Sequence, residues 1–156
     1  MVTMDWLLEK YGESHQNPIN KLIHWLCVPS IVLSAFGILY AVPFVVERGL
    51  FTNWAFVFYV SALIWYLRLS VPIAVGMAVV CGAMILGVDA IYNAVGRDAL
   101  SLVKVSVGIF AAAWVVQFIG HKIEGKKPSF LDDLKFLMVG PAWLLHFIYK
   151  KIGIRW

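Results

Sequence analysis

The fold is decided by the stretch Leu102–Gly120, which reads LVKVSVGIFAAAWVVQFIG and contains one charged residue, Lys104. A helix of this length can cross the hydrocarbon layer of a membrane, which is about 30 Å thick. Three apolar segments precede it and a shorter one follows it: Leu22–Val46, Trp54–Leu67, Val71–Tyr92 and Phe136–Tyr149. The pattern predicts an all-α, polytopic membrane helical bundle with about four transmembrane helices and a short C-terminal helix.

The composition agrees with a membrane protein. The chain has 156 residues, of which 62% are hydrophobic and 14% charged, whereas soluble domains usually carry about 25% charged residues. The net charge is +4, but the basic residues flank the apolar segments and form no stripe with interleaved aromatics, which argues against nucleic-acid binding. We expect one integral membrane domain over residues 1–156, with a polar N-terminal segment at 1–20 and a polar loop at 121–135.

Prolines mark the expected breaks in the helices. The segment Arg68–Pro72 is typical of a tight turn between two helices, because proline cannot continue the helical hydrogen bonds. Pro29 and Pro43 fall inside the first apolar segment, where neighbouring helices can satisfy the freed carbonyls. The C-terminal segment has Gly140 and Pro141 in its middle and lysines after it, so we expect a re-entrant or interfacial helix.

The distribution of Lys and Arg predicts the orientation in the membrane. Four crossings place both termini on one side, and cytoplasmic loops are enriched in basic residues. Only Arg48, Arg97 and Lys104 of the 13 Lys and Arg lie on the opposite side. We therefore expect both termini in the cytoplasm. The compact chain favours a bacterial inner membrane, and in a eukaryote the endoplasmic reticulum is the expected location.

All histidines lie at segment ends or in the short last segment: His15, His24, His121 and His146. His24 follows Asn20 by four positions and His121 follows Gln117 by four, so each shares a helix face with a polar side chain. Four crossings return the chain to the face from which it departed, so the first three histidines can converge. Neutral imidazole binds iron, zinc, copper and nickel, and three such ligands leave coordination positions open.

Other roles are possible for these polar residues. Each histidine could be an interfacial side chain that is hydrogen-bonded to a headgroup or a carbonyl, and Glu124, Asp132 and Asp133 could be solvated loop charges. Alternatively, Glu124 or Asp133 orients a ligating imidazole, as carboxylates commonly do, while Lys127 attracts the carboxylate of an amphiphilic substrate. His146 is a further candidate ligand, because ionisable residues inside membrane segments tend to mark function.

Two stretches of the sequence go beyond helical periodicity. The first is Tyr11-x3-His15-x-Asn17-Pro18-x-Asn20-x3-His24-x4-Pro29. The second is Gln117-Phe118-Ile119-Gly120-His121, with Lys127-Pro128, Asp132-Asp133-Leu134 and Gly140-Pro141 after it. Together, and over nearly the full length, the chain resembles the 2-hydroxy fatty acid dioxygenase family, whose fungal members act in fatty-acid α-oxidation during the breakdown of phytosphingosine.

The resemblance implies an iron(II)-dependent enzyme that uses O2 to shorten a long-chain 2-hydroxy fatty acid by one carbon, with release of CO2. It implies that His15, His24 and His121 are metal ligands. Asn17, Asn20 and Gln117 match polar positions of the family and become candidates for orienting the ligands or the substrate. His146 stands where relatives often have a glutamate, and both residue types can bind a metal.

Two other classes of protein remain open at this stage. A non-enzymatic membrane protein could use the same histidines to hold a structural metal, or could bind lipid without one. A small transporter or channel is disfavoured by the few charges within the spans and by the lack of an evident inverted repeat. Histidines alone do not distinguish iron from zinc, and the sequence does not specify the acyl chain length or the oligomeric state.

Overall fold

The computed structural model describes residues 3–125 and 136–156, and these residues form helices joined by loops, with no strand among them. In chain order the helices are α1 (Met4–Gly12), α2 (Pro18–Ala41), α3 (Trp54–Leu69), α4 (Val71–Ala94), α5 (Ala99–Glu124) and α7 (Val139–Ile152). The all-α class is therefore confirmed. The helices α2, α4 and α5 are long and apolar enough to cross a membrane, whereas α3 is apolar but has only 16 residues.

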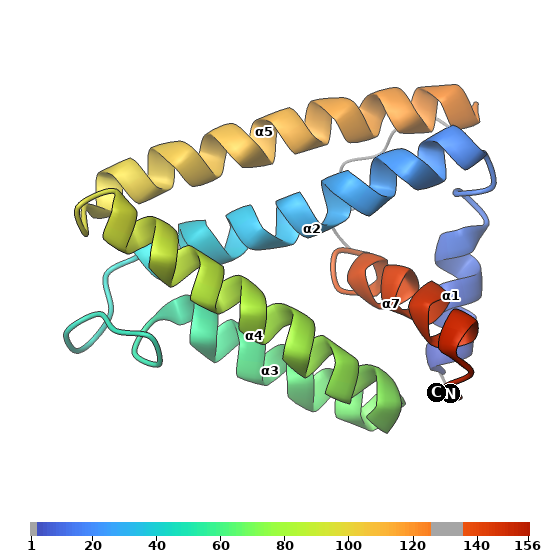
Figure 1. The fold of residues 1–156 in the computed structure, drawn as a ribbon, viewed down its shortest axis with the longest axis horizontal. Helices are drawn as coiled ribbons and strands as arrows, with labels where there is room; N and C mark the ends of the chain where they lie inside the picture. Colours follow the sequence, from blue (N-terminus) through green and yellow to red (C-terminus); the bar gives the residue numbers. More distant parts are fainter. Residues whose placement is uncertain (1–2, 126–135) are drawn as a thin grey trace.

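The helices form two antiparallel pairs that spread apart like a wedge (Figure 1). In one pair, α5 lies alongside α2, and in the other α4 lies alongside α3. The pairs approach each other where α2 ends and α5 begins, and α1 and α7 pack together at the open end of the wedge. The chain termini lie close together there, and the Trp156 indole donates a hydrogen bond to Asp5 at 2.8 Å.

The outer faces of the long helices are apolar. Val75, Val79 and Leu86 of α4 are each more than half exposed, as are Val115 and Ile119 of α5. An apolar surface of this kind on long helices suits contact with lipid chains and not with water.

Ser70 makes the tight turn that Arg68–Pro72 predicted. Its N–H donates to the Tyr66 carbonyl at 2.8 Å and ends α3, while its hydroxyl accepts from the Ile73 N–H at 3.3 Å and begins α4. Pro72 falls in the first turn of α4, where its missing N–H has no intrahelical partner to lose.

The helices differ from the sequence-based segments in three places. The first apolar helix ends at Ala41 and not at Val46, because Val42 precedes Pro43 and takes the extended conformation that a following proline favours. The polar N-terminal segment contains a helix, α1, which Thr3 caps through the Trp6 N–H. The expected loop at 121–135 begins as helix, since α5 continues to Glu124 before Gly125 ends it in the left-handed conformation.

The C-terminal helix α7 packs inside the wedge against α1, α2 and α4. Its first half is buried, from Val139 to Leu145. Pro141 falls within the first turn and not in the middle, which is a position that proline tolerates. A re-entrant or interfacial placement of α7 in the bilayer stays a prediction.

Candidate metal centre

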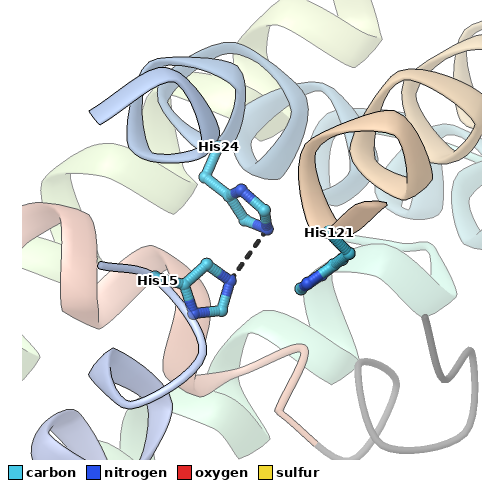
Figure 2. Close-up of side chains that lie close together, drawn as sticks. All are labelled: His15, His24 and His121. Carbon is cyan, nitrogen blue, oxygen red and sulfur yellow. Dashed lines mark hydrogen bonds between the residues drawn. The ribbon is translucent and has the colours of Figure 1, made fainter. Parts of the chain in front are cut away.

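Three histidines from separate elements meet at the open end of the wedge (Figure 2). His15 lies in the turn after α1, His24 in the second turn of α2, and His121 in the last turn of α5. Their side chains point toward one another, and the residues are only 2%, 0% and 4% exposed. One donor atom from each lies within 4.8 Å of the others, and among the described residues this is the group of His, Cys, Asp and Glu that could hold a metal ion.

In two of the rings, the hydrogen bond that Nδ1 makes indicates which tautomer is present. His15 Nδ1 lies 2.6 Å from the Tyr11 carbonyl, and His24 Nδ1 lies 2.9 Å from the Asn20 carbonyl. Because a carbonyl oxygen only accepts, each Nδ1 carries the hydrogen. The Nε2 atom of each neutral ring therefore presents a lone pair toward the cluster, as in metal-ligating histidines whose other nitrogen is anchored.

The two Nε2 atoms of His15 and His24 lie 2.9 Å apart. Two lone pairs at this distance need a proton or a cation between them. Burial lowers the pKa of His15 from 6.5 to about 4, so a shared proton is disfavoured at neutral pH. Two nitrogens at this separation can both reach a single ion at a usual metal–nitrogen distance of about 2.0–2.1 Å. The donor set therefore fits a metal ion.

Two aromatic rings enclose His15. The Tyr11 ring stacks on it with the centroids 4.2 Å apart, and the Trp143 ring lies 5.2 Å away. Tyr11 and Trp143 also contact each other edge to face at 5.3 Å. These contacts hold the imidazole in one orientation and keep water from that side. The four-residue spacing of Tyr11 and His15 was a usable signal for the first contact, whereas nothing in the sequence pointed to Trp143.

Glu124 connects the end of α5 to the turn that carries His15. Its carboxylate accepts hydrogen bonds from the N–H groups of Gln16 and Asn17, both at 2.8 Å, and from Asn20 Nδ2 at 3.0 Å. Asn20 also donates to the Ser14 carbonyl at 3.2 Å. Glu124 thus binds the backbone beside His15 and the side chain of Asn20, the residue whose carbonyl anchors His24.

The structure also locates the other candidate polar residues. Asn17 caps α2, since its side chain accepts the Ile19 N–H at 2.9 Å. Gln117 is 3% exposed one helical turn before His121, and its Oε1 has no hydrogen-bond partner within the described part of the chain. Lys127 and Asp133 lie outside the described residues.

His146 does not join the cluster of the three other histidines. Its Nδ1 donates to the Trp143 carbonyl at 2.5 Å, and the Trp143 ring contacts both His146 and His15. Instead, His146 lines a groove of about 410 Å3 that reaches His15 from the surface, together with Lys21 and Gln16. His146 was a candidate fourth ligand, and the structure brings the other three histidines together without it.

Taken together, these features define an all-α protein with three helices that could span a membrane and a buried histidine cluster that could bind a metal. The chain belongs to the family described as 2-hydroxy-palmitic acid dioxygenase Mpo1-like, whose model matches residues 1–152. It is 28% identical over 145 residues to the 2-hydroxy-palmitic acid dioxygenase MPO1 of Saccharomyces cerevisiae, covering 92% of this chain and 78% of that protein. No solved structure matches the chain.

Proposed function

We propose that this chain is an iron(II)-dependent dioxygenase that shortens a long-chain 2-hydroxy fatty acid by one carbon. The overall reaction balances as R–CH(OH)–COOH with O2 giving R–COOH, CO2 and H2O. Membership of the family supports the substrate class. The single observation that supports a bound metal is the convergence of His15, His24 and His121, with two of the rings anchored through Nδ1.

The three histidines would hold the iron through ring nitrogens. A bound iron supplies a Lewis acid and a centre for O2 activation. The chain's own residues provide the surroundings: Tyr11 and Trp143 shield one side from water, and the groove lined by Lys21 gives access from the surface. The Lys21 ammonium in that groove suits attraction of the carboxylate of an incoming acid.

We also propose that the protein crosses the membrane several times, with the histidine cluster near the face that bears the termini. A 2-hydroxy fatty acid is amphiphilic, so a site at that depth can meet its polar head while its tail stays in an apolar region. Membrane lipids would cover the exposed valines and leucines of α4 and α5.

The test is elemental analysis of detergent-purified protein loaded anaerobically with iron and cleared of loosely bound metal. We expect near-stoichiometric iron in the wild type and its loss in His24→Ala and His121→Ala. His146→Ala is the matched control, because this histidine lies outside the cluster, and it should retain the iron.

Oxygen consumption with 2-hydroxyhexadecanoic acid then separates the enzyme from a non-enzymatic metal- or lipid-binding protein. Turnover that gives CO2 and the acid one carbon shorter would support the proposal. Folded protein that retains iron yet consumes no oxygen with any 2-hydroxy acid would reject the enzyme. Iron retained by all three alanine variants would reject the site.

A further inference from the structure

An apolar cavity of about 290 Å3 lies inside the wedge, between α2, α3, α4 and the start of α7. Its lining contains no charged side chain, and the Tyr66 hydroxyl in it is hydrogen-bonded to the Met138 carbonyl. Ligand pockets usually range from about 300 to 1,000 Å3, so this cavity lies at the small end of that range and can hold the methyl-end part of an acyl chain. Phe58 at its edge is 39% exposed, which leaves a lateral approach from surrounding lipid.

A second, much smaller cavity, here called the neck, lies between this cavity and Tyr11. The neck has space of about 10 Å3, roughly that of one water molecule, and Leu137 lines both it and the larger cavity. At its other end lies Tyr11, whose ring stacks on His15. Because the neck has room for only about one water molecule, its side chains must move apart to admit an acyl chain. An elongated molecule bound in this way would have one end beside Tyr11 and His15 and the other in the larger apolar cavity.

Gln117 lines the neck and gives it a polar group. The residue is 3% exposed, and its Oε1 lacks a donor among the described residues. Leaving a buried acceptor without a donor is unfavourable, so a ligand hydroxyl at this point would be stabilised. Because Gln117 is one turn from His121 on the same helix face, that hydroxyl would lie close to the proposed metal.

We propose that the cavity binds the hydrocarbon tail of the 2-hydroxy acid and that Gln117 accepts a hydrogen bond from the 2-hydroxyl group. The inference rests on the proposed function for the identity of the ligand. The methyl end of the tail lies near Phe58 and Ala62, and the size of the cavity limits the acyl chain length. The hydroxyl distinguishes the substrate from a plain fatty acid of the same length.

The tail position is tested by photo-crosslinking with a 2-hydroxyhexadecanoic acid that carries a diazirine near its methyl end. Purified, metal-free protein is irradiated under anaerobic conditions, and the labelled residues are mapped by mass spectrometry. We expect labels on cavity residues of α3 and α4 such as Ala62 and Met77. Ala62→Phe, which fills the cavity, should reduce these labels about tenfold.

Two further variants keep this test decisive. Ala112→Phe adds the same ring at an exposed position of α5 outside the cavity and should leave the labels unchanged. Ala35→Leu fills the cavity from the partly exposed side of α2 and serves if Ala62→Phe does not fold. Labels confined to outward-facing residues, or labels that neither cavity variant reduces, would overturn the proposal.

The role of Gln117 is tested by competition in the same crosslinking experiment. Unlabelled 2-hydroxyhexadecanoic acid should compete about tenfold better than hexadecanoic acid in the wild type, as expected for one buried hydrogen bond, and equally well in Gln117→Leu. An unchanged preference in the variant would overturn this assignment. Neither experiment uses iron or turnover, so a failure here leaves the proposed dioxygenase standing, and a lack of turnover leaves the tail site standing.

Discussion

Asn20 is the residue through which the three histidine-bearing segments are connected. Its side-chain nitrogen donates to Ser14 in the turn beside His15 and to Glu124 at the end of α5, while its carbonyl anchors His24. The side chain is fully buried. If one of these partners moves, the ring nitrogens of the cluster therefore shift as well, because one or two hydrogen bonds connect them.

Glu124 is the partner whose removal gives the clearest prediction. Glu124→Ala removes three hydrogen bonds to an anionic acceptor and leaves Gln16, Asn17 and Asn20 without it. Groups that support metal ligands typically contribute about 10–100-fold to metal affinity, and we expect a loss in this range. The measurement is iron affinity by anaerobic titration.

The control for this prediction is Glu13→Ala, which removes a carboxylate from the turn between α1 and His15. Glu13 is exposed and pairs only with Lys10, at 2.7 Å, within the interactions that the structure describes for it, and exposed pairs contribute little. Its iron affinity should match that of the wild type. Equal losses in the two variants would show that Glu124 acts only through surface charge.

Residue spacing predicted part of this centre. The four-residue relations of Asn20 with His24 and of Gln117 with His121 placed polar groups on shared helix faces, and the even number of helices from α2 to α5 returned the chain to the end where the histidines meet. The role of Trp143 was not predictable, because it depends on how α7 packs inside the wedge. The contacts of Glu124 likewise depend on α5 continuing one turn beyond its apolar stretch.

The pairing of α2 with α5 determines how closely the histidine-bearing helices approach. At Gly120, a Cβ atom would lie 2.5 Å from Asn20 Oδ1 and 3.2 Å from Ile23 Cγ2, so no side chain fits without movement. Gly37 and Ser106 form a second close contact further along the same pair. Small residues of this kind allow helix backbones to pack closely in membranes.

Gly120→Ala should therefore separate the helices at the site. We expect a decrease of about 1–3 kcal/mol in the free energy of unfolding, as for overpacking in a close-packed core, and weaker iron binding, since the Asn20 side chain must shift. The measurement is unfolding in detergent with the iron titration repeated on the folded variant.

Gly108→Ala is the matched control on the same helix, because a Cβ atom there meets nothing within 4 Å. Alanine favours a helix over glycine by up to about 1 kcal/mol, so this variant should be as stable as the wild type or slightly more stable. If both alanine variants behaved alike, the close approach at Gly120 would not limit the packing.

Element boundaries were predictable where a local signal was strong and not elsewhere. The turn at Ser70 followed from Pro72, which cannot continue the hydrogen bonds of a preceding helix. In contrast, the apolar residues after Ala41 concealed the end of α2, since Val45 and Val46 are exposed and lie outside any helix. Hydropathy alone records how apolar a segment is and does not record where its backbone leaves the helix.

At the scale of the whole molecule, the positions of the helix ends and of the basic residues indicate the same orientation in the membrane. The start of α2, the turn between α3 and α4 and the end of α5 all lie toward the wide end of the wedge, where the termini also lie (Figure 1). Near these ends the described basic residues are Lys10, Lys21, Arg68, Lys122, Lys150, Lys151 and Arg155. Near the narrow end they are Arg48, Arg97 and Lys104. This asymmetry favours the wide end, and with it the histidine cluster, on the cytoplasmic side.

Single-cysteine labelling in sealed vesicles tests this arrangement, with a maleimide that does not cross membranes. Glu47→Cys after α2 and Ala94→Cys at the end of α4 should react from one side, and Glu13→Cys and Lys151→Cys only from the other. The wild type is the background control, because Cys27 and Cys81 are buried.

If Glu47→Cys and Glu13→Cys reacted from the same side, α2 would not cross the membrane, and a metal site facing the cytoplasm could not be inferred from the basic residues. If instead Ala94→Cys and Lys151→Cys both changed sides while Glu47→Cys did not, the short helix α3 would not cross the membrane, so three crossings would remain and α5 would run in the opposite direction to that proposed.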